Sequence, residues 1–321
     1  MTTLIVTSSW PRTGDELAGT FVRTDALVRA REGGAVLVAA PARPGIARGG
    51  EGLTVIDVPH GGLFGSPGAA HRAMGAPFRL LGLLPFARAL REILERSRPD
   101  AIVAHWLVPS GLVIDSVLDA SRAASRGTSL ELIAHGADVR FLAALPRPAA
   151  RRILERVARR ASRVRAVSEE LSARLLAIAP ALRAKTFVAP MPLATDDPQS
   201  RVHAQVAARG LEGGGRPLHV VASRLIASKR IERAIDHVGE RGGRLVVIGD
   251  GPMRAKLSAR ARRAGIDARF VGARPHDETL AWIAAADVVL APLAPHEGAP
   301  TAAREAESLG RTVIRFAARD A

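Results

Sequence analysis

The amino-acid sequence predicts an α/β protein with two units, each holding a parallel sheet flanked by helices. Short apolar runs of strand length alternate with amphipathic segments of helical period along almost the whole chain. Unbroken apolar runs of this kind are typical of strands buried on both faces by helices. The alternation breaks once, near residues 189–217, and then restarts. At 321 residues the chain is long enough for two domains with separate cores.

The first half begins with a strand and keeps alternating. The strands predicted there are residues 4–7, 35–39, 53–58, 101–104, 130–134 and 164–167. The amphipathic stretches that predict helices are residues 21–31, 78–96 and 147–160. We expect Pro85 to break the second of these helices. Ser168 is expected to cap the helix that starts at Glu169, because a serine oxygen accepts hydrogen bonds from free N–H groups.

A linker is expected between the halves, because residues 189–200 are rich in proline and small polar residues and residues 210–217 in glycine. The strands predicted beyond it are residues 218–222, 245–248, 268–271, 288–291 and 312–316. The helices predicted there are residues 231–241, 252–264, 277–286 and 301–309. The sequence therefore predicts two Rossmann-like domains, residues 1–195 and 196–321, that face a cleft. In such sheets ligands bind beyond the carboxyl ends of the strands.

Composition narrows the function classes. The chain has no cysteine, which excludes disulfides, zinc–thiolate sites and thiol catalysis. The net charge of +15 favours anionic partners such as nucleotide phosphates or acidic lipid head groups. Nucleic acid is not expected, because aromatic residues are only 3% and no nucleic-acid motif accompanies the charge. Neither a transmembrane helix nor a secretory signal is expected from the hydropathy pattern.

Loops after predicted strands carry residues suited to phosphates and sugars. Gly19 precedes a helix whose free N–H groups can approach an anion, although a plain surface turn is the alternative. His135 ends a strand and can hydrogen-bond a substrate, or simply close the strand. Arg224 and Lys229 flank the loop after residues 218–222 and can hold a diphosphate from two sides.

Two further segments contain candidate binding motifs. Residues 249–252 form a glycine turn after a strand, but no third glycine or ribose carboxylate follows, so NAD is not expected. Glu297 lies in a predicted loop and Glu305 in the next predicted helix. The loop carboxylate can meet a sugar and the helix carboxylate a ribose, whereas the alternative is a solvated helix face.

The ordered set of motifs resembles glycosyltransferase family 4, the retaining transferases of GT-B fold. The matching segments include IAHGADV, RVRAVSEEL, VVIGDGPMRAKL and EGAPTAAREAESLG, and the matches span nearly the whole chain. The resemblance implies transfer of a sugar from a nucleotide-sugar donor to a hydroxyl acceptor, in polysaccharide or glycolipid biosynthesis. It implies no metal and no other cofactor, and a cytoplasmic enzyme.

The resemblance also assigns roles to single residues. The catalytic residues beside the transferred sugar would be His135 and Glu297. The residues that would bind the donor diphosphate are Gly19, Arg224 and Lys229. The residues that would bind the nucleobase and the ribose are Ala273, Arg274 and Glu305, with Glu305 on the ribose hydroxyls.

The chain departs from the family pattern in two ways that matter here. Arg230 follows Lys229 where the family usually has glycine. The chain also stops just after its last predicted strand, so a shortened, incomplete C-terminal domain is expected. Two alternatives therefore stay open: a non-catalytic nucleotide-sugar-binding or partner subunit, and a UDP-sugar epimerase of the same fold.

Residues 77–94 are apolar with interspersed Arg79, Arg88 and Arg91. One interpretation is a helix pair at an anionic membrane, which would fit a lipid-linked acceptor and a peripheral position at the inner membrane face. The other interpretation is an ordinary helix that faces the core. The acceptor surface itself is expected on the N-terminal domain, near His105 and Trp106.

Overall fold

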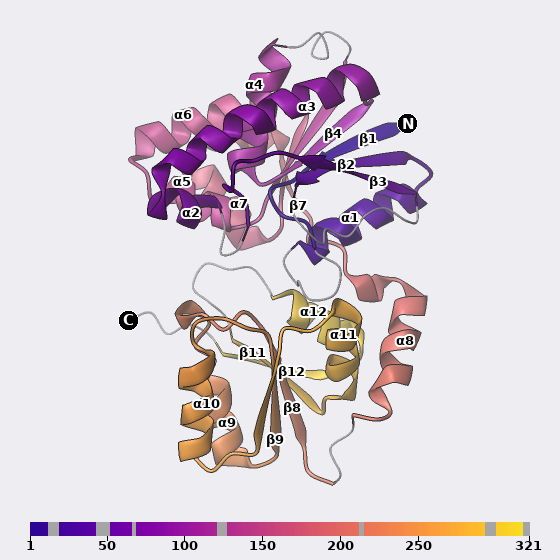
Figure 1. The fold of residues 1–321 in the computed structure, drawn as a ribbon, viewed down its shortest axis with the longest axis vertical. Helices are drawn as coiled ribbons and strands as arrows, with labels where there is room; N and C mark the ends of the chain where they lie inside the picture. The colour runs from indigo at the N-terminus through magenta and orange to yellow at the C-terminus, as the bar shows by residue number, and fades with distance from the viewer. Residues whose placement is uncertain are drawn as a thin grey trace. The chain divides into compact units, whose positions relative to one another are not determined.

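The computed structural model describes residues 1–11, 19–42, 52–65, 69–120, 127–211, 215–292 and 300–316. The chain forms two compact units, the first ending at Met191 and the second beginning at Pro192. This division lies a few residues before the boundary predicted after residue 195. Within each unit, parallel strands form a central sheet with helices on its two faces (Figure 1).

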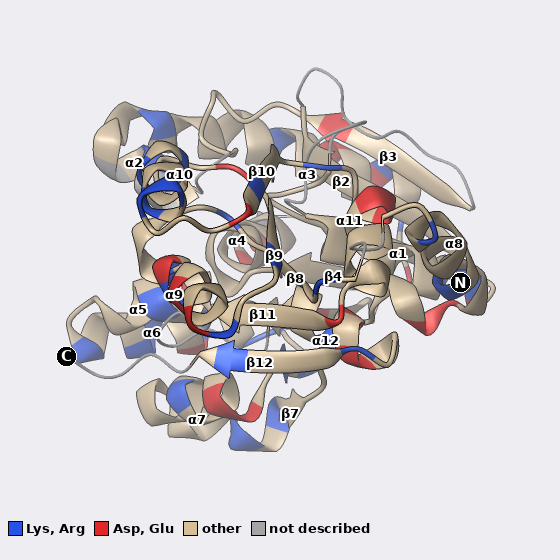
Figure 2. Cartoon of the chain, turned by 90° about the horizontal axis from the view of Figure 1, so that it is seen from below, with Lys and Arg blue, Asp and Glu red and all other residues tan. Residues whose placement is uncertain are grey.

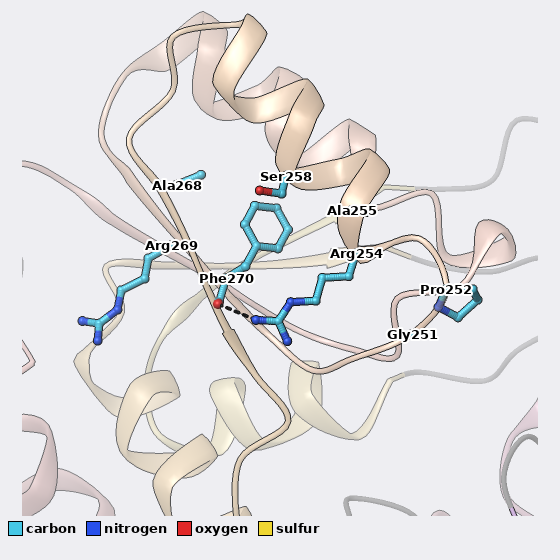
Figure 3. A pocket seen from close by; sticks show the side chains of 8 residues that line it. All are labelled: Gly251, Pro252, Arg254, Ala255, Ser258, Ala268, Arg269 and Phe270. Carbon is cyan, nitrogen blue, oxygen red and sulfur yellow. Dashed lines mark hydrogen bonds between the residues drawn. The ribbon is translucent and has the colours of Figure 1, made fainter.

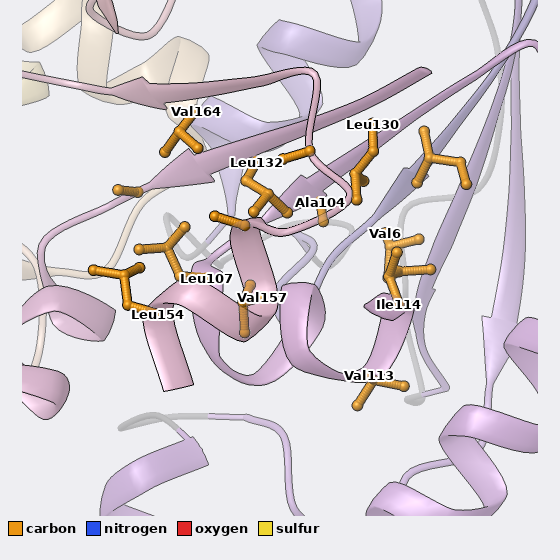
Figure 4. Packing of buried hydrophobic residues seen from close by; sticks show 14 of the residues in the cluster. Val6, Ala104, Leu107, Val113, Ile114, Leu130, Leu132, Leu154, Val157 and Val164 are labelled. Atoms are coloured by element: carbon orange, nitrogen blue, oxygen red, sulfur yellow. The ribbon is translucent and has the colours of Figure 1, made fainter. Parts of the chain in front are cut away.

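The described residues of the first unit form a seven-stranded parallel sheet of order β3-β2-β1-β4-β5-β6-β7. Its strands are β1 (Thr2–Val6), β2 (Ala35–Pro41), β3 (Leu53–Val58), β4 (Ala101–His105), β5 (Ser129–Ala134), β6 (Arg163–Ala166) and β7 (Thr186–Val188). Successive residues point to opposite faces. Leu4 and Val6 enter one hydrophobic cluster and Ile5 another, so helices bury both faces, as the apolar runs predict. Figure 4 shows part of the larger cluster.

The helices of this unit connect one parallel strand to the next. They are α1 (Thr20–Arg31), α2 (Ala69–Gly75), α3 (Leu83–Ser97), α4 (Leu112–Ala120), α5 (Ala137–Ala143), α6 (Arg147–Ala158) and α7 (Glu169–Ile178). Shorter helical turns are η1 (Pro77–Gly82), η2 (Leu107–Gly111) and η4 (Pro180–Lys185). The side chain of Ser168 accepts a hydrogen bond from Leu171 N at 3.2 Å, which confirms the predicted cap of α7.

The predicted break at Pro85 is wrong. Pro85 is the third residue of α3, where its missing N–H leaves no hydrogen bond unmade. The chain changes direction earlier, between Gly82 and Leu83, where η1 gives way to α3. A Cβ on Gly82 would lie 2.1 Å from the carbonyl oxygen of His60, so only glycine allows this close backbone approach.

The described residues of the second unit form a five-stranded parallel sheet of order β10-β9-β8-β11-β12. Its strands are β8 (Leu218–Ala222), β9 (Arg244–Ile248), β10 (Ala268–Gly272), β11 (Val288–Pro292) and β12 (Thr312–Phe316). Its helices are α8 (Pro198–Ala208), α9 (Glu232–Arg241), α10 (Arg254–Arg263), α11 (His276–Ala285) and α12 (Thr301–Ser308), with short turns η5 (Ala194–Asp196) and η6 (Ala227–Lys229). Val220 and Val221 enter different clusters, so this sheet is also covered on both faces.

Each predicted strand is present, and both sheets have Rossmann-like order, so the predicted fold class is confirmed. The linker prediction is wrong for residues 194–200, which form η5 and the start of α8; Asp197 caps α8 by accepting a hydrogen bond from Ser200 N at 3.0 Å. Helix α10 begins at Arg254, two residues after the predicted Pro252. None of the helices that the structure describes combines the length and apolarity needed to cross a bilayer.

Candidate functional site

Arg224 and Lys229 lie on one loop at the carboxyl end of β8, where open parallel sheets bind ligands. Arg224 is exposed, whereas Lys229 is only 9% exposed. The N–H of Lys229 donates to the carbonyl oxygen of Ile226 at 3.0 Å and closes the short turn η6. The structure therefore brings the two predicted diphosphate-binding cations onto one loop, one on its surface and one within it.

The turn after β9 seats this loop. Gly249 and Gly251 have φ values of +127° and +154°, and a Cβ on them would lie 1.9 Å from Ser223 O and 2.5 Å from Leu225 O. Leu225 N–H also donates to Asp250 O at 2.9 Å. The glycine turn thus packs against the backbone of the loop after β8, which gives the turn a structural role other than NAD binding.

Arg230 occupies a position that suits glycine. Its φ and ψ are 45° and 46°, in the left-handed region that non-glycine residues rarely adopt. This backbone conformation explains why the related family usually has glycine after the lysine. The arginine here is accommodated at a cost in backbone strain.

The predicted nucleobase and ribose residues lie close together. Ala273 and Arg274 follow β10, and His276 begins α11 two residues later. The imidazole of His276 lies with Nε2 2.7 Å from the Oε1 atom of Glu305, which is 2% exposed on α12. The contact joins the segment after β10 to α12, the helix that carries Glu305, which is predicted to bind the ribose.

A shallow hollow of about 680 Å³ lies beside the edge strand β10 (Figure 3). Arg254 crosses it and donates to the carbonyl oxygen of Phe270 at 3.1 Å, while it also pairs with Asp250 at 3.0 Å. The other lining residues come from the same turn, helix and strand: Gly251, Pro252, Ala255, Ser258, Ala268 and Arg269. None of the predicted site residues lines the hollow. It borders the glycine turn at Gly251 and Pro252.

Helix α10 is the most basic helix of the second unit, and Figure 2 shows its blue turns. Some of this charge is compensated locally. Arg260 pairs with Asp236 of α9 at 2.7 Å, and Arg254 pairs with Asp250. Surface pairs of this kind reduce the field that a distant anion experiences.

In the first unit, Gly19 is the N-cap of α1 with φ +87°. A Cβ there would lie 2.9 Å from the backbone of Trp10. Glycine is required because of this close approach and because of the positive φ. Its carbonyl accepts the first helical hydrogen bonds, from Val22 and Arg23. Gly19 therefore starts the helix that carries Phe21 toward His135.

His135 follows β5 and is surrounded by rings. The ring centroid of Phe21 lies 4.9 Å away, that of Trp106 4.9 Å and that of His105 5.1 Å, the last nearly parallel to it. Burial by these rings lowers the pKa of His135 well below its usual range, and the neighbouring His105 lowers it further. His135 is half-buried, and its lowered pKa makes it a neutral imidazole at neutral pH.

A buried line of polar side chains extends inward from His135. His105, 0% exposed, has its Nδ1 atom 3.0 Å from His135 Nε2 and its Nε2 atom 3.5 Å from Asp25 Oδ2. Asp25 also accepts from Arg29 Nε at 2.7 Å and lies 3.3 Å from Arg165. Burial raises the pKa of Asp25, but His105 and Arg29 outweigh it and hold the pKa well below its usual range. Asp25 is therefore a carboxylate.

Asp138, which follows His135 by three residues, ties two strand-end loops together. Its carboxylate accepts hydrogen bonds from the backbone N–H groups of Leu107 at 2.8 Å, His135 at 3.1 Å and Val139 at 3.0 Å. Burial raises the pKa of Asp138 to about 6, against the effect of these donors. The adjoining Trp106 has φ 69°, a strained value for a bulky residue.

Glu297, predicted to be catalytic, lies outside the described residues. Within the parts of the chain that the structure describes, no three potential metal-ligating side chains come together.

The sequence prediction missed Asp25 and His276. An acid among the buried positions Val22, Asp25 and Ala26 of α1 was the available signal for the first. His276 had no comparable signal, because its partner Glu305 is far along the chain.

Residues 19–196 match the protein family described as Glycosyltransferase Family 4, and residues 218–320 match the family described as Glycosyl transferases group 1. The chain belongs to glycosyltransferase family 4. The motif-based resemblance is thereby confirmed, and the family match covers more than half of the chain.

A curated relative of this family 4 chain is 2-deoxystreptamine glucosyltransferase of Streptomyces kanamyceticus, 35% identical over 114 residues. That match covers 33% of the chain and 29% of the relative's length.

Solved structures of GT-B type share the fold across 98% of the chain. HepE of Anabaena in complex with UDP is 18% identical with a TM-score of 0.63, and 80% of it is covered. The catalytic domain of starch synthase IV of Arabidopsis thaliana, bound to ADP and acarbose, is 16% identical with a TM-score of 0.68, and 82% of it is covered. WaaG, a glycosyltransferase involved in lipopolysaccharide biosynthesis, is 17% identical with a TM-score of 0.63 and 80% coverage. The GT-B fold that the motifs imply is thus confirmed.

Proposed function

We propose that this chain transfers a sugar, with retention of anomeric configuration, from a nucleotide-sugar donor to a hydroxyl acceptor in polysaccharide or glycolipid synthesis. The observation that carries the proposal is the carboxyl edge of the five-stranded sheet. Buried Lys229 and buried Glu305 both lie on elements that follow strands at this edge. The ammonium group of Lys229 suits a diphosphate and the carboxylate of Glu305 suits ribose hydroxyls, so this edge offers one group for each part of a nucleotide.

Each residue has a chemical task in this proposal. Arg224 and Lys229 stabilise the negative charge that develops on the diphosphate as the sugar leaves. Glu305 accepts hydrogen bonds from the ribose hydroxyls, and its contact with His276 fixes the carboxylate. His135 and Glu297 act on the sugar itself. Retention follows from attack on the face that the leaving phosphate vacates, with the phosphate taking the acceptor proton.

The base of the donor is a question for experiment. The HepE structure contains UDP and the starch synthase structure contains ADP. We therefore infer that the donor is a nucleoside diphosphate sugar and that the loop of Ala273 and Arg274 determines which nucleobase binds. UDP-, ADP- and GDP-sugars belong in the first donor panel.

The test is product analysis with each donor, with and without glycan and lipid acceptors. Lys229→Ala should weaken donor binding ten- to hundredfold, because a hydrogen bond to a charged group contributes roughly 1.5–3 kcal/mol. Lys256→Ala is the matched control, since Lys256 is an exposed lysine of the same unit. Turnover that Lys229→Ala and Glu297→Ala both leave unchanged contradicts the proposal.

The same assay separates the alternatives. An epimerase converts the donor sugar with no acceptor present, and a structure of UDP-N-acetylglucosamine 2-epimerase from Rickettsia bellii shares the fold at 14% identity and TM-score 0.58. A partner subunit binds nucleotide without turnover. Transfer that requires the acceptor supports the transferase.

We also propose that η1 and the start of α3 contact an anionic membrane at the cytoplasmic face, where a lipid-linked acceptor would be found. Phe78, Leu80, Leu81 and Leu84 form an exposed apolar patch, with exposed fractions of 70%, 50%, 65% and 68%. Arg79 lies within it. Large apolar side chains that cluster on a surface mark interaction sites.

The rest of α3 packs inward, because Phe86, Leu90 and Leu94 are buried. The segment thus combines a core-facing helix with an exposed apolar end. Arg88 and Arg91 form pairs with Glu92 and Glu95, so apolar insertion rather than charge carries the proposed contact.

Co-sedimentation with phosphatidylglycerol and phosphatidylcholine vesicles tests this contact. Phe78→Ser with Leu81→Ser should release the protein from anionic vesicles. Val202→Ser with Val206→Ser is the matched control, because these exposed valines lie on α8 of the other unit. Equal release by both double variants, or no vesicle binding by the wild type, contradicts the membrane contact.

A further inference from the structure

Three polar side chains from distant parts of the sequence form a line inside the first unit. Asp25 comes from α1, His105 ends β4 and His135 follows β5. Asp25 and His105 are 3% and 0% exposed, while His135 is half-buried. The line therefore runs outward from a buried carboxylate to a half-buried imidazole.

The distances fix where the hydrogen atoms lie. His105 Nε2 is fully buried, has no hydrogen bond among the described residues and is 3.5 Å from the Asp25 carboxylate. A lone pair on this nitrogen would face a negative charge, so Nε2 carries the hydrogen. In neutral His105 the other nitrogen, Nδ1, is then an acceptor. Nε2 of His135, 3.0 Å away, must donate to it.

We propose that Asp25 and His105 are positioning residues that fix the tautomer of His135, so that its Nδ1 atom faces the substrate as a hydrogen-bond acceptor. The partner is a hydroxyl group of the donor sugar or of the acceptor. The sugar hydroxyl rests on the proposed function, whereas the tautomer depends only on the protein.

The arrangement also passes a proton. When His135 Nδ1 takes up a proton, its Nε2 hydrogen moves to His105 Nδ1. The positive charge then lies on His105, beside the Asp25 carboxylate, and His135 becomes a donor at Nδ1. One proton enters and one shifts by one hydrogen bond, so the charge balances.

Charged side chains from α1, β5, β6 and α5 lie around the line of Asp25, His105 and His135. Arg29 contacts both Asp25 and Glu131 of β5, at 2.7 and 3.3 Å. Arg165 of β6 lies 3.3 Å from Asp25. Asp138 of α5 holds the backbone of His135. His105 and Arg29 keep Asp25 ionised, and the carboxylate in turn fixes the orientation of His105.

The first test observes the hydrogens directly. Long-range ¹H–¹⁵N correlation spectra of protein labelled with ¹⁵N-histidine distinguish protonated from bare ring nitrogens. We expect the Nε2–H form of His135 at pH 7.5, together with a bare Nδ1 on His105. His135→Gln and His105→Phe assign the signals. A His135 that carries its hydrogen on Nδ1 at pH 7.5 overturns the proposal.

The second test measures how much the sugar contributes to binding. The affinity of the nucleotide sugar is divided by that of the bare nucleoside diphosphate. In His105→Phe this ratio should fall roughly three- to tenfold, the loss of one neutral hydrogen bond, with diphosphate affinity unchanged. His203→Gln, an exposed histidine of α8, is the control. Should His105→Phe not fold, the wild-type spectra at pH 7.5 decide.

The two tests fail separately. The Nε2–H form of His135 without any nucleotide binding would preserve the tautomer assignment and contradict the proposed function. Nucleotide-sugar binding with a ratio unchanged in His105→Phe would do the reverse.

Discussion

Gly249→Ala tests whether the glycine turn supports the loop after β8, which carries Arg224 and Lys229. The new Cβ would lie 1.9 Å from the carbonyl oxygen of Ser223, although real contacts stay beyond about 3.0 Å. The loop after β8 must therefore move by about an ångström, and the alanine must hold φ near +127°. Overpacking of this kind costs roughly 1–3 kcal/mol and backbone strain another 1–3. We expect the free energy of unfolding to fall by about 4 kcal/mol.

Gly265→Ala is the matched control. Gly265 also has a positive φ, +65°, but a Cβ on it would meet no described atom within 4 Å, so only the backbone cost of about 1 kcal/mol applies. Urea denaturation followed by circular dichroism compares the two variants. Hydrogen exchange of residues 218–230 shows whether the loop loosens. Equal stability of the two variants, with unchanged exchange, would refute the close packing of turn and loop.

Three further predictions concern stability. Asp138→Asn should lower the free energy of unfolding by roughly 1–3 kcal/mol, because an amide cannot accept hydrogen bonds from all three backbone N–H groups. Urea denaturation measures this loss. Asp119→Asn, at an exposed position, is the control and should have less than half the effect. Burial lowers the pKa of His135, His219 and His237, so the folded state resists protonation and stability should fall as pH drops below about 6.5. Asp138, with its pKa raised to about 6, opposes this trend. Replacing both His219 and His237 by Asn should make the fall in a pH series of melts smaller, while His135 keeps its share of it. Arg230→Gly should raise stability by up to about 1 kcal/mol by relieving its left-handed backbone, and a lower melting temperature would contradict that interpretation.

The sequence predicted the strands well because the central ones are apolar runs buried on both faces, a pattern visible without any partner. The three-residue edge strand β7 was missed, since so short a segment has no period. The helix α8 was hidden in a proline-rich stretch. There Asp197 and Pro198 start a helix, whereas composition alone indicated a linker.

The site was predictable where one segment holds the whole motif. Arg224 and Lys229 share a loop, and Glu305 follows a strand that the sequence predicts. The chain of Asp25, His105 and His135 could not be predicted in this way, because the sheet order β1-β4-β5 brings together residues from three distant segments. Burial and ring distances, which determine the pKa of His135, exist only in the folded protein.

The central claim is that the chain binds a nucleotide sugar. The most direct measurement is thermal unfolding with a panel of nucleoside diphosphates and their sugars. A ligand that binds only the native state at 100 times its Kd adds about 2.7 kcal/mol to the free energy of unfolding. We predict a clear rise in Tm with one base and a further rise with one of its sugars. A folded sample whose Tm no member of the panel changes would contradict the claim.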